Sequence, residues 1–133
     1  LAGWLNSPAE CLALVILLDQ FPRNMFRGTA RAFAADPLAR DAARSILSQG
    51  WDRSMDDSRR LFAYLPFEHS ESLPDQDLAC ELMKDFDPEQ VRYALRHREI
   101  IRRFGRFPHR NAALGRPSTE EEAAFLKEPG SGF

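Results

Sequence analysis

The chain has little of what marks a membrane or secreted protein. Its longest apolar run, at positions 11–18, is eight residues long, whereas a membrane-spanning helix needs about 20. No basic start, apolar stretch and small-residue cleavage site follow one another, so no signal peptide is predicted. The two cysteines, Cys11 and Cys80, lie in apolar helical contexts, which predicts buried, reduced thiols in a cytoplasmic protein without membrane contact.

A large excess of charge of one sign is also missing. The net charge of −2, from 18 basic and 20 acidic residues, excludes a polycation that binds nucleic acid in bulk. The charges are nevertheless uneven, with eight arginines against one acid between Arg92 and Arg116 and seven acids against one lysine between Glu71 and Glu89. Two interpretations stay open. The two segments can form oppositely charged faces that pair with each other or lie in solvent. Alternatively, the arginines can form an anion site, because their guanidinium groups suit carboxylate and phosphate.

Motifs of the common catalytic and cofactor sites are missing as well. The chain has no HExxH, no CxxC, no phosphate-binding glycine loop and no nucleophile elbow, and the arginine-rich stretch contains no nucleic-acid recognition motif. His69 next to Ser70 does not make a catalytic triad, because sequence neighbours rarely face each other usefully. We therefore predict no metal, no cofactor and no nucleic-acid partner.

Helix start and stop signals, by contrast, are frequent. Ser7-Pro8-Ala9-Glu10 forms a capping box before an apolar run, and Pro22 and Pro66 are expected to end helices because the residue before proline disfavours helical geometry. No segment alternates with a period of two, so no strand is predicted. The expected helices cover 8–20, 30–35, 36–49, 55–64, 73–85, 88–104 and 119–127, the last opened by a capping box at Ser118.

These elements predict one all-α domain over residues 1–133, because the length leaves no room for a second. Short connections between the helices favour antiparallel hairpins. The first helix is apolar on all sides between positions 11 and 18, which predicts a central place in the bundle.

Three polar segments break the local rules. Asp19 follows the apolar run near an expected helix C-terminus, where a negative charge is disfavoured, so we expect it to be partly buried and paired. Phe-Pro-Arg-Asn at 21–24 has an echo in Phe-Pro-His-Arg-Asn at 107–111, and Glu-His-Ser-Glu at 68–71 separates two helices. All three can be helix caps or solvated turns, or they can meet in a site. His97 is expected to be a hydrogen-bonded core histidine, and His109 the most exposed of the three histidines.

Three long runs make the chain recognisable. LDQFPRNMFRGTARAFA at 18–34, LPFEHSESLPDQ at 65–76 and the stretch from HREIIRRFGRFPHRN at 97–111 to the end closely resemble the bacterial domain-of-unknown-function 924 family. The resemblance implies a tetratricopeptide-like array of about six to seven helices in an intracellular protein, with no established activity and no assigned catalytic residue. It also implies a further N-terminal segment, most of which we expect this chain to lack.

Two functional hypotheses follow. In the first, a pocket binds a small anionic metabolite, and if it is catalytic, His69 or His109 is the acid or base and Arg110 holds the anion. Its predicted residues are Asp19, Arg23, Asn24, His69, Glu71, His109, Arg110 and Asn111. In the second, the fold is a protein-interaction module or a homodimer. The unusual residues concentrate in loops rather than along helix faces, which favours the pocket.

Overall fold

Helices account for all the regular structure in the part of the chain that is described. The computed structural model describes residues 2–132, which contain seven α-helices, four short 3-10 helices and no strand, so the all-α prediction is confirmed. Within this range no helix is both long and apolar enough to cross a membrane. The elements are η1 (Ala2–Leu5), α1 (Pro8–Met25), η2 (Ala30–Ala32), α2 (Asp36–Gln49), η3 (Trp51–Ser54), α3 (Asp57–Glu68), α4 (Leu73–Leu82), α5 (Pro88–Phe104), η4 (Pro108–Arg110), α6 (Asn111–Leu114) and α7 (Glu120–Leu126).

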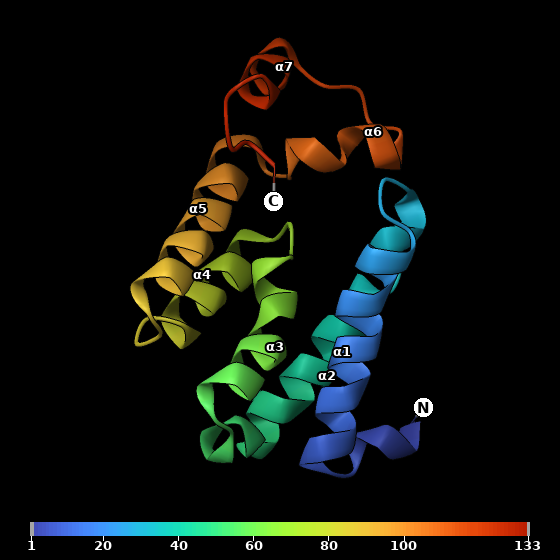
Figure 1. Ribbon diagram of the computed structural model, residues 1–133, viewed down its shortest axis with the longest axis vertical. Helices are drawn as coiled ribbons and strands as arrows, with labels where there is room; N and C mark the ends of the chain where they lie inside the picture. Colours follow the sequence, from blue (N-terminus) through green and yellow to red (C-terminus); the bar gives the residue numbers. More distant parts are fainter. Residues whose placement is uncertain (1, 133) are drawn as a thin grey trace.

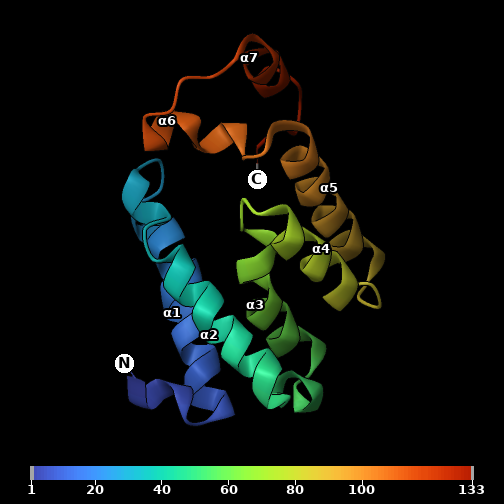
Figure 2. The ribbon, with the colours of Figure 1, turned by 180° about the vertical axis from the view of Figure 1, so that it is seen from behind.

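The first five α-helices alternate in direction, and each packs against the one that follows it (Figure 1). α1 and α2 form one side of the molecule, α4 and α5 the other, and α3 lies between them (Figure 2). Helices α1, α3 and α5 therefore end at the same end of the bundle, where α2 begins and where η4 and α6 cross over. This end of the bundle brings together the three unusual polar segments.

The helices begin and end at the residue types that physical chemistry favours. Ser7 accepts a hydrogen bond from the Glu10 N–H at 3.3 Å, and Asp87 caps α5 in the same way. Gly105 ends α5 with a φ of 72°, in the left-handed region that glycine adopts without strain. The last capping box is one residue later than expected, because Thr119 and not Ser118 caps α7.

Proline proved a weaker stop signal than expected. α1 continues to Met25 with Pro22 inside it, and α3 continues to Glu68 with Pro66 inside it. A proline removes one backbone donor from a helix and disfavours helical geometry in the residue before it. Pro66 is fully buried, whereas Pro22 is half-buried in a turn whose Phe21 and Met25 are exposed. Both predicted helix ends were too early.

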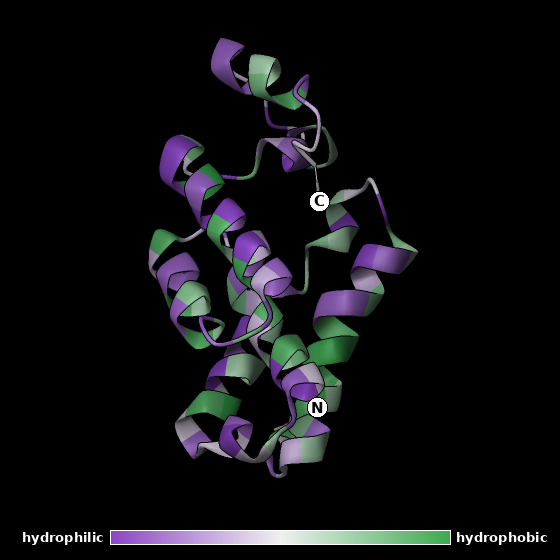
Figure 3. Cartoon of the chain, turned by 60° about the vertical axis from the view of Figure 1, so that its left-hand side comes forward, coloured by the Kyte–Doolittle hydropathy of each residue, from purple (hydrophilic) through white to green (hydrophobic). Residues whose placement is uncertain are grey.

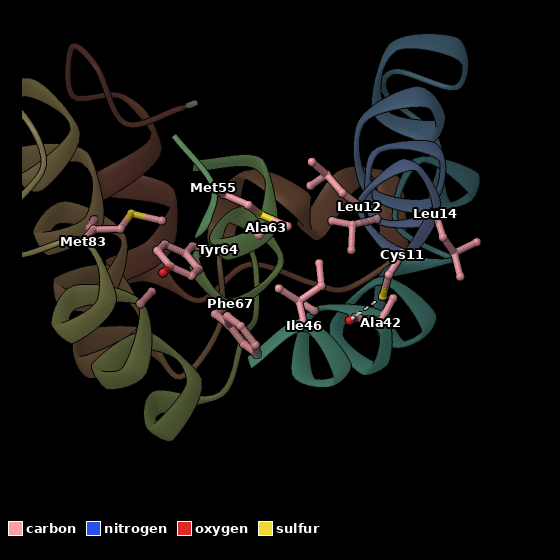
Figure 4. Packing of buried hydrophobic residues seen from close by; sticks show 14 residues of the cluster. Cys11, Leu12, Leu14, Ala42, Ile46, Met55, Ala63, Tyr64, Phe67 and Met83 are labelled. Atoms are coloured by element: carbon pink, nitrogen blue, oxygen red, sulfur yellow. Dashed lines mark hydrogen bonds between the residues drawn. The ribbon is translucent and has the colours of Figure 1, made fainter. Parts of the chain in front are cut away.

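The main core lies between α1, α2, α3 and α4. Figure 4 shows core side chains of α1, α2 and α3, together with Met83 directly after α4, and the Cys11 thiol donating to the Ala42 carbonyl at 3.3 Å. Phe67 and Ile46 are completely buried there. The hydropathy colouring in Figure 3 alternates along the helices, as expected when each helix buries one face. A smaller cluster, Ile100, Ile101, Phe107 and Phe125, joins α5 to the C-terminal elements.

α1 lies at the edge of the bundle rather than at its centre (Figures 1 and 2). Its α-helical neighbours are α2 and α3, and its outer side carries the exposed residues Leu17, Phe21 and Met25. The prediction of a central helix was therefore wrong, because an apolar sequence on all sides does not supply neighbours on all sides.

Truncation of the core should reveal its contribution to stability. Phe67→Ala removes a side chain with 0% exposure and leaves a cavity, so the free energy of unfolding should fall by about 3–5 kcal/mol. Leu95→Ala is the control, because this side chain is 44% exposed and should cost less than about 1 kcal/mol. Urea denaturation measures both, and equal losses would contradict the assignment of the core.

Candidate functional site

A cavity of about 440 Å³ opens where α1, α3, α5 and η4 meet. Three arginines, Arg23, Arg27 and Arg110, contribute to its wall, together with all three histidines of the chain. The remaining lining residues are Gln20, Asn24, Gly28, Ala32, Phe33, Leu65 and Phe107. In the described part of the chain, no aspartate or glutamate lines this cavity. C-terminal helix ends favour cations, which helps to explain why arginines gather here.

Arg23, a residue of the cavity wall, connects α1 to the start of α2. Its guanidinium forms a two-pronged ion pair with Asp36 at the start of α2, with N···O distances of 2.8 and 2.9 Å. The same Nη1 donates to the Asp19 carboxylate at 3.1 Å and to the Asp19 carbonyl at 2.9 Å. Both carboxylates are buried, and charges in such a place are tolerated only when paired.

Asp19 lies well inside α1 and is 1% exposed. It accepts hydrogen bonds from Gln20 Nε2 at 2.7 Å and meets His69 Nδ1 at 2.9 Å. Burial acts to raise the pKa of this carboxyl, but its close contact with His69, followed by the Arg23 charge and the Gln20 hydrogen bond, more than reverses that effect, so its pKa lies below its ordinary value. The expected burial and pairing are present, although the expected position at a helix end is not.

Arg110 is held between two aromatic rings. Its guanidinium carbon lies 4.4 Å from the centre of the Phe33 ring and 4.8 Å from that of Phe107. Nη2 donates to the His69 carbonyl at 2.7 Å, and Nη1 lies 3.7 Å from Asp36. Burial, with the nearby Arg23 charge, lowers the pKa of Arg110 to about 10, which still leaves it charged at neutral pH.

Two of the histidines are held neutral. Burial lowers the pKa of His97 to about 3, although its Nδ1 hydrogen-bonds to the Tyr93 carbonyl at 2.7 Å. Burial, and then the Arg110 charge, lower the pKa of His109 to about 4. His97 is a hydrogen-bonded buried histidine, as predicted. His109 is half-buried, as is His69, and its ring lies 5.5 Å from that of Phe107.

Glu68 is a buried acid beside this network. It is 5% exposed, and its Oε1 has no hydrogen-bond partner within residues 2–132. Burial, together with the Asp19 charge, raises its pKa to about 7. A carboxyl group in such a place is held protonated over a wider pH range than usual.

Glu71 and Asn111 lie outside the cavity and brace the loop that forms one wall. Glu71 accepts the Phe107 N–H at 2.6 Å and pairs with both terminal nitrogens of Arg116 at 2.9 and 3.0 Å. Asn111 accepts from Arg116 Nε at 3.0 Å and donates to Ser118 at 3.1 Å. These contacts join residues far apart in the sequence and fix the position of η4.

The structure thus separates the eight predicted residues into two groups. Arg23, Asn24, His69, His109 and Arg110 line the cavity, whereas Asp19, Glu71 and Asn111 support it from outside.

Several residues of the site were not among the predicted ones. In the sequence, Asp36 before Pro37 indicates only the start of a helix, and the position of His97 indicates only a core residue. Gln20, Arg27 and Phe33 carry no sequence signal that separates them from ordinary helix and turn residues. Within residues 2–132, no three histidine, cysteine or acidic side chains are grouped to hold a metal ion.

Comparison with known proteins places the chain in a family. Residues 1–130 match the family model described as bacterial protein of unknown function (DUF924). The chain belongs to the DUF924 family. A solved structure described as a protein of unknown function, ATU0120 from Agrobacterium tumefaciens, is 47% identical in sequence to this DUF924 chain. It superposes with a TM-score of 0.90, and the match covers 94% of this chain and 71% of that chain. No curated protein matches the sequence.

The buried acid of this DUF924 protein gives a pH test. In the unfolded chain Glu68 has its ordinary pKa of 4.5, and in the folded protein its pKa is about 7. Between these values the folded state retains a proton that the unfolded state has lost, so this group's stabilising contribution falls as the pH rises. Glu68→Gln should therefore raise the free energy of unfolding by up to about 3 kcal/mol at pH 8, with a gap that narrows toward pH 4.5.

Urea denaturation between pH 4.5 and 8 measures this gap. Glu99→Gln is the matched control, because its side chain is 66% exposed and the change should leave the pH slope as it is. A constant difference between wild type and Glu68→Gln across this range would contradict the assignment.

Proposed function

We propose that the cavity binds a small organic anion, a carboxylate or phosphate with an apolar body. The observation that carries the proposal is the composition of the wall, which holds three arginines and no acidic residue in a chain that has more acids than bases. Arginine forks suit planar carboxylate and phosphate groups. The volume of about 440 Å³ lies within the range of small-molecule sites.

The balance of charge around the cavity supports this proposal. Arg23 and Arg110 share Asp36 and Asp19 behind the wall. Arg27 hydrogen-bonds to Asn24 at 3.4 Å and forms no ion pair within residues 2–132. Three guanidinium groups therefore meet two carboxylates, and the remaining positive charge is available to an anion.

The rest of the wall suits the uncharged part of such a ligand. Phe33 and Leu65 supply apolar surface next to the arginines, and the fully buried Phe107 lies beside them. Their burial of an apolar group would add affinity that an inorganic ion cannot obtain. The interaction-module hypothesis rests on fold analogy alone, which is a weak basis for function.

Anion-dependent thermal unfolding tests the proposal. Phosphate, citrate and 3-phenylpropanoate are compared with chloride at constant ionic strength. At a concentration of 100 times Kd, binding adds about 2.7 kcal/mol of stability, so at least one organic anion should raise the Tm by about 10 °C. Arg27→Gln should reduce this shift, because it removes the guanidinium without an ion-pair partner.

The control is Arg59→Gln, an equal loss of charge at the first turn of α3, where the side chain is 65% exposed. This variant should keep the full anion effect. The proposal fails if no anion raises the Tm above the chloride value, or if both variants reduce the shift equally.

A further inference from the structure

His69 is held in a fixed orientation at the cavity wall. Its Nδ1 lies 2.9 Å from Asp19 Oδ1. An ionised carboxylate only accepts hydrogen bonds, so Nδ1 must carry the proton in this contact. In the neutral ring Nε2 then has no proton and is a hydrogen-bond acceptor.

The carboxylate that imposes this arrangement is itself fixed. Asp19 is 1% exposed, and its two oxygens also accept from Gln20 at 2.7 Å and from Arg23 at 3.1 Å. Asp19 lies behind the wall, whereas His69 lines the cavity. Because Nδ1 is engaged by Asp19, Nε2 is the ring nitrogen left to meet a ligand in the cavity that His69 lines.

The charged groups that line the cavity with His69 Nε2 are all hydrogen-bond donors. Arg23, Arg27 and Arg110 can only donate hydrogen bonds. A simple carboxylate satisfies the arginines but offers no proton to His69. A buried acceptor left without a donor weakens binding, because its lost contact with water is not replaced.

We propose that the ligand is a hydroxy acid, whose anionic group binds the arginines while its hydroxyl group donates to His69 Nε2. This inference rests on the proposed function and specifies the ligand class of the same cavity. It also assigns His69, rather than His109, as the residue that recognises the second polar group.

A pair of probes that differ only in a hydroxyl group tests this inference. 3-Phenyllactate and 3-phenylpropanoate share an anionic group and an aromatic body. Isothermal titration of the full chain at pH 8.5, where histidine rings are ordinarily neutral, gives both dissociation constants. One enantiomer of 3-phenyllactate should bind roughly three- to tenfold more tightly than 3-phenylpropanoate, the gain expected from one hydrogen bond.

Two substitutions separate recognition from a structural role. The amide nitrogen in His69→Asn takes the place of Nδ1 and keeps the bond to Asp19, but nothing replaces Nε2, so the affinity ratio should fall to about one. The amide of His69→Gln reaches the place of Nε2 and should restore part of the preference. A merely structural role for His69 would change both affinities alike and leave their ratio unaltered.

Equal affinity of the two acids for the wild type, or an unchanged ratio in His69→Asn, would overturn the inference and leave the proposed function standing, because both acids would then bind. Failure of both acids to bind would also overturn it. In that case the Tm shifts measured with phosphate and citrate test the proposed function separately.

Discussion

The end of the bundle depends on the ion pairs of Arg23. One guanidinium bonds to Asp36 at the start of α2, and to both the carboxylate and the carbonyl of Asp19 in α1. Asp19 in turn orients His69 at the end of α3, and Asp36 lies 3.7 Å from Arg110 of η4. Four elements therefore meet through two buried carboxylates. Removal of one partner would leave a buried charge uncompensated, which is strongly destabilising.

This arrangement places Asp19 and Asp36 behind the cavity wall and the arginines in the wall itself. The carboxylates of Asp19 and Asp36 pair with Arg23 and Arg110 from outside the cavity, whereas Arg27 forms no ion pair within residues 2–132. Burial and the Arg110 charge keep His109 neutral, and burial keeps His97 neutral. A bound anion would meet preorganised donors, which lowers the cost of ordering side chains on binding. Glu71, which accepts the Phe107 N–H and pairs with Arg116, fixes the loop at Phe107 and so helps to preorganise the cavity wall.

The helical class and the burial of Asp19 could be predicted from the sequence because each depends on local physics. Capping residues act within a turn, and a charge directly after an apolar run has to be buried and paired. The two Phe-Pro segments and the Glu-His-Ser-Glu segment each contribute at least one residue to the cavity wall, and their role in binding stays a prediction.

What could not be predicted depends on tertiary contacts. Asp36 reads as a helix start, and only the approach of Arg23 gives it a second role. Pro22 and Pro66 lie inside helices although the residue before a proline disfavours helical geometry. Glu71 and Asn111 resemble their cavity-lining neighbours in sequence, and only the fold shows that they face Arg116 instead.

The central claim is that this cavity is an anion site. Anomalous diffraction from crystals of the chain soaked in bromide tests it most directly, because bromide binds wherever positive charge is accessible and can be located without ambiguity. The account predicts an anomalous peak inside the cavity, within contact distance of Arg27 and of Arg23 or Arg110. Peaks confined to the arginine-rich outer face of α5, with none in the cavity, would contradict it.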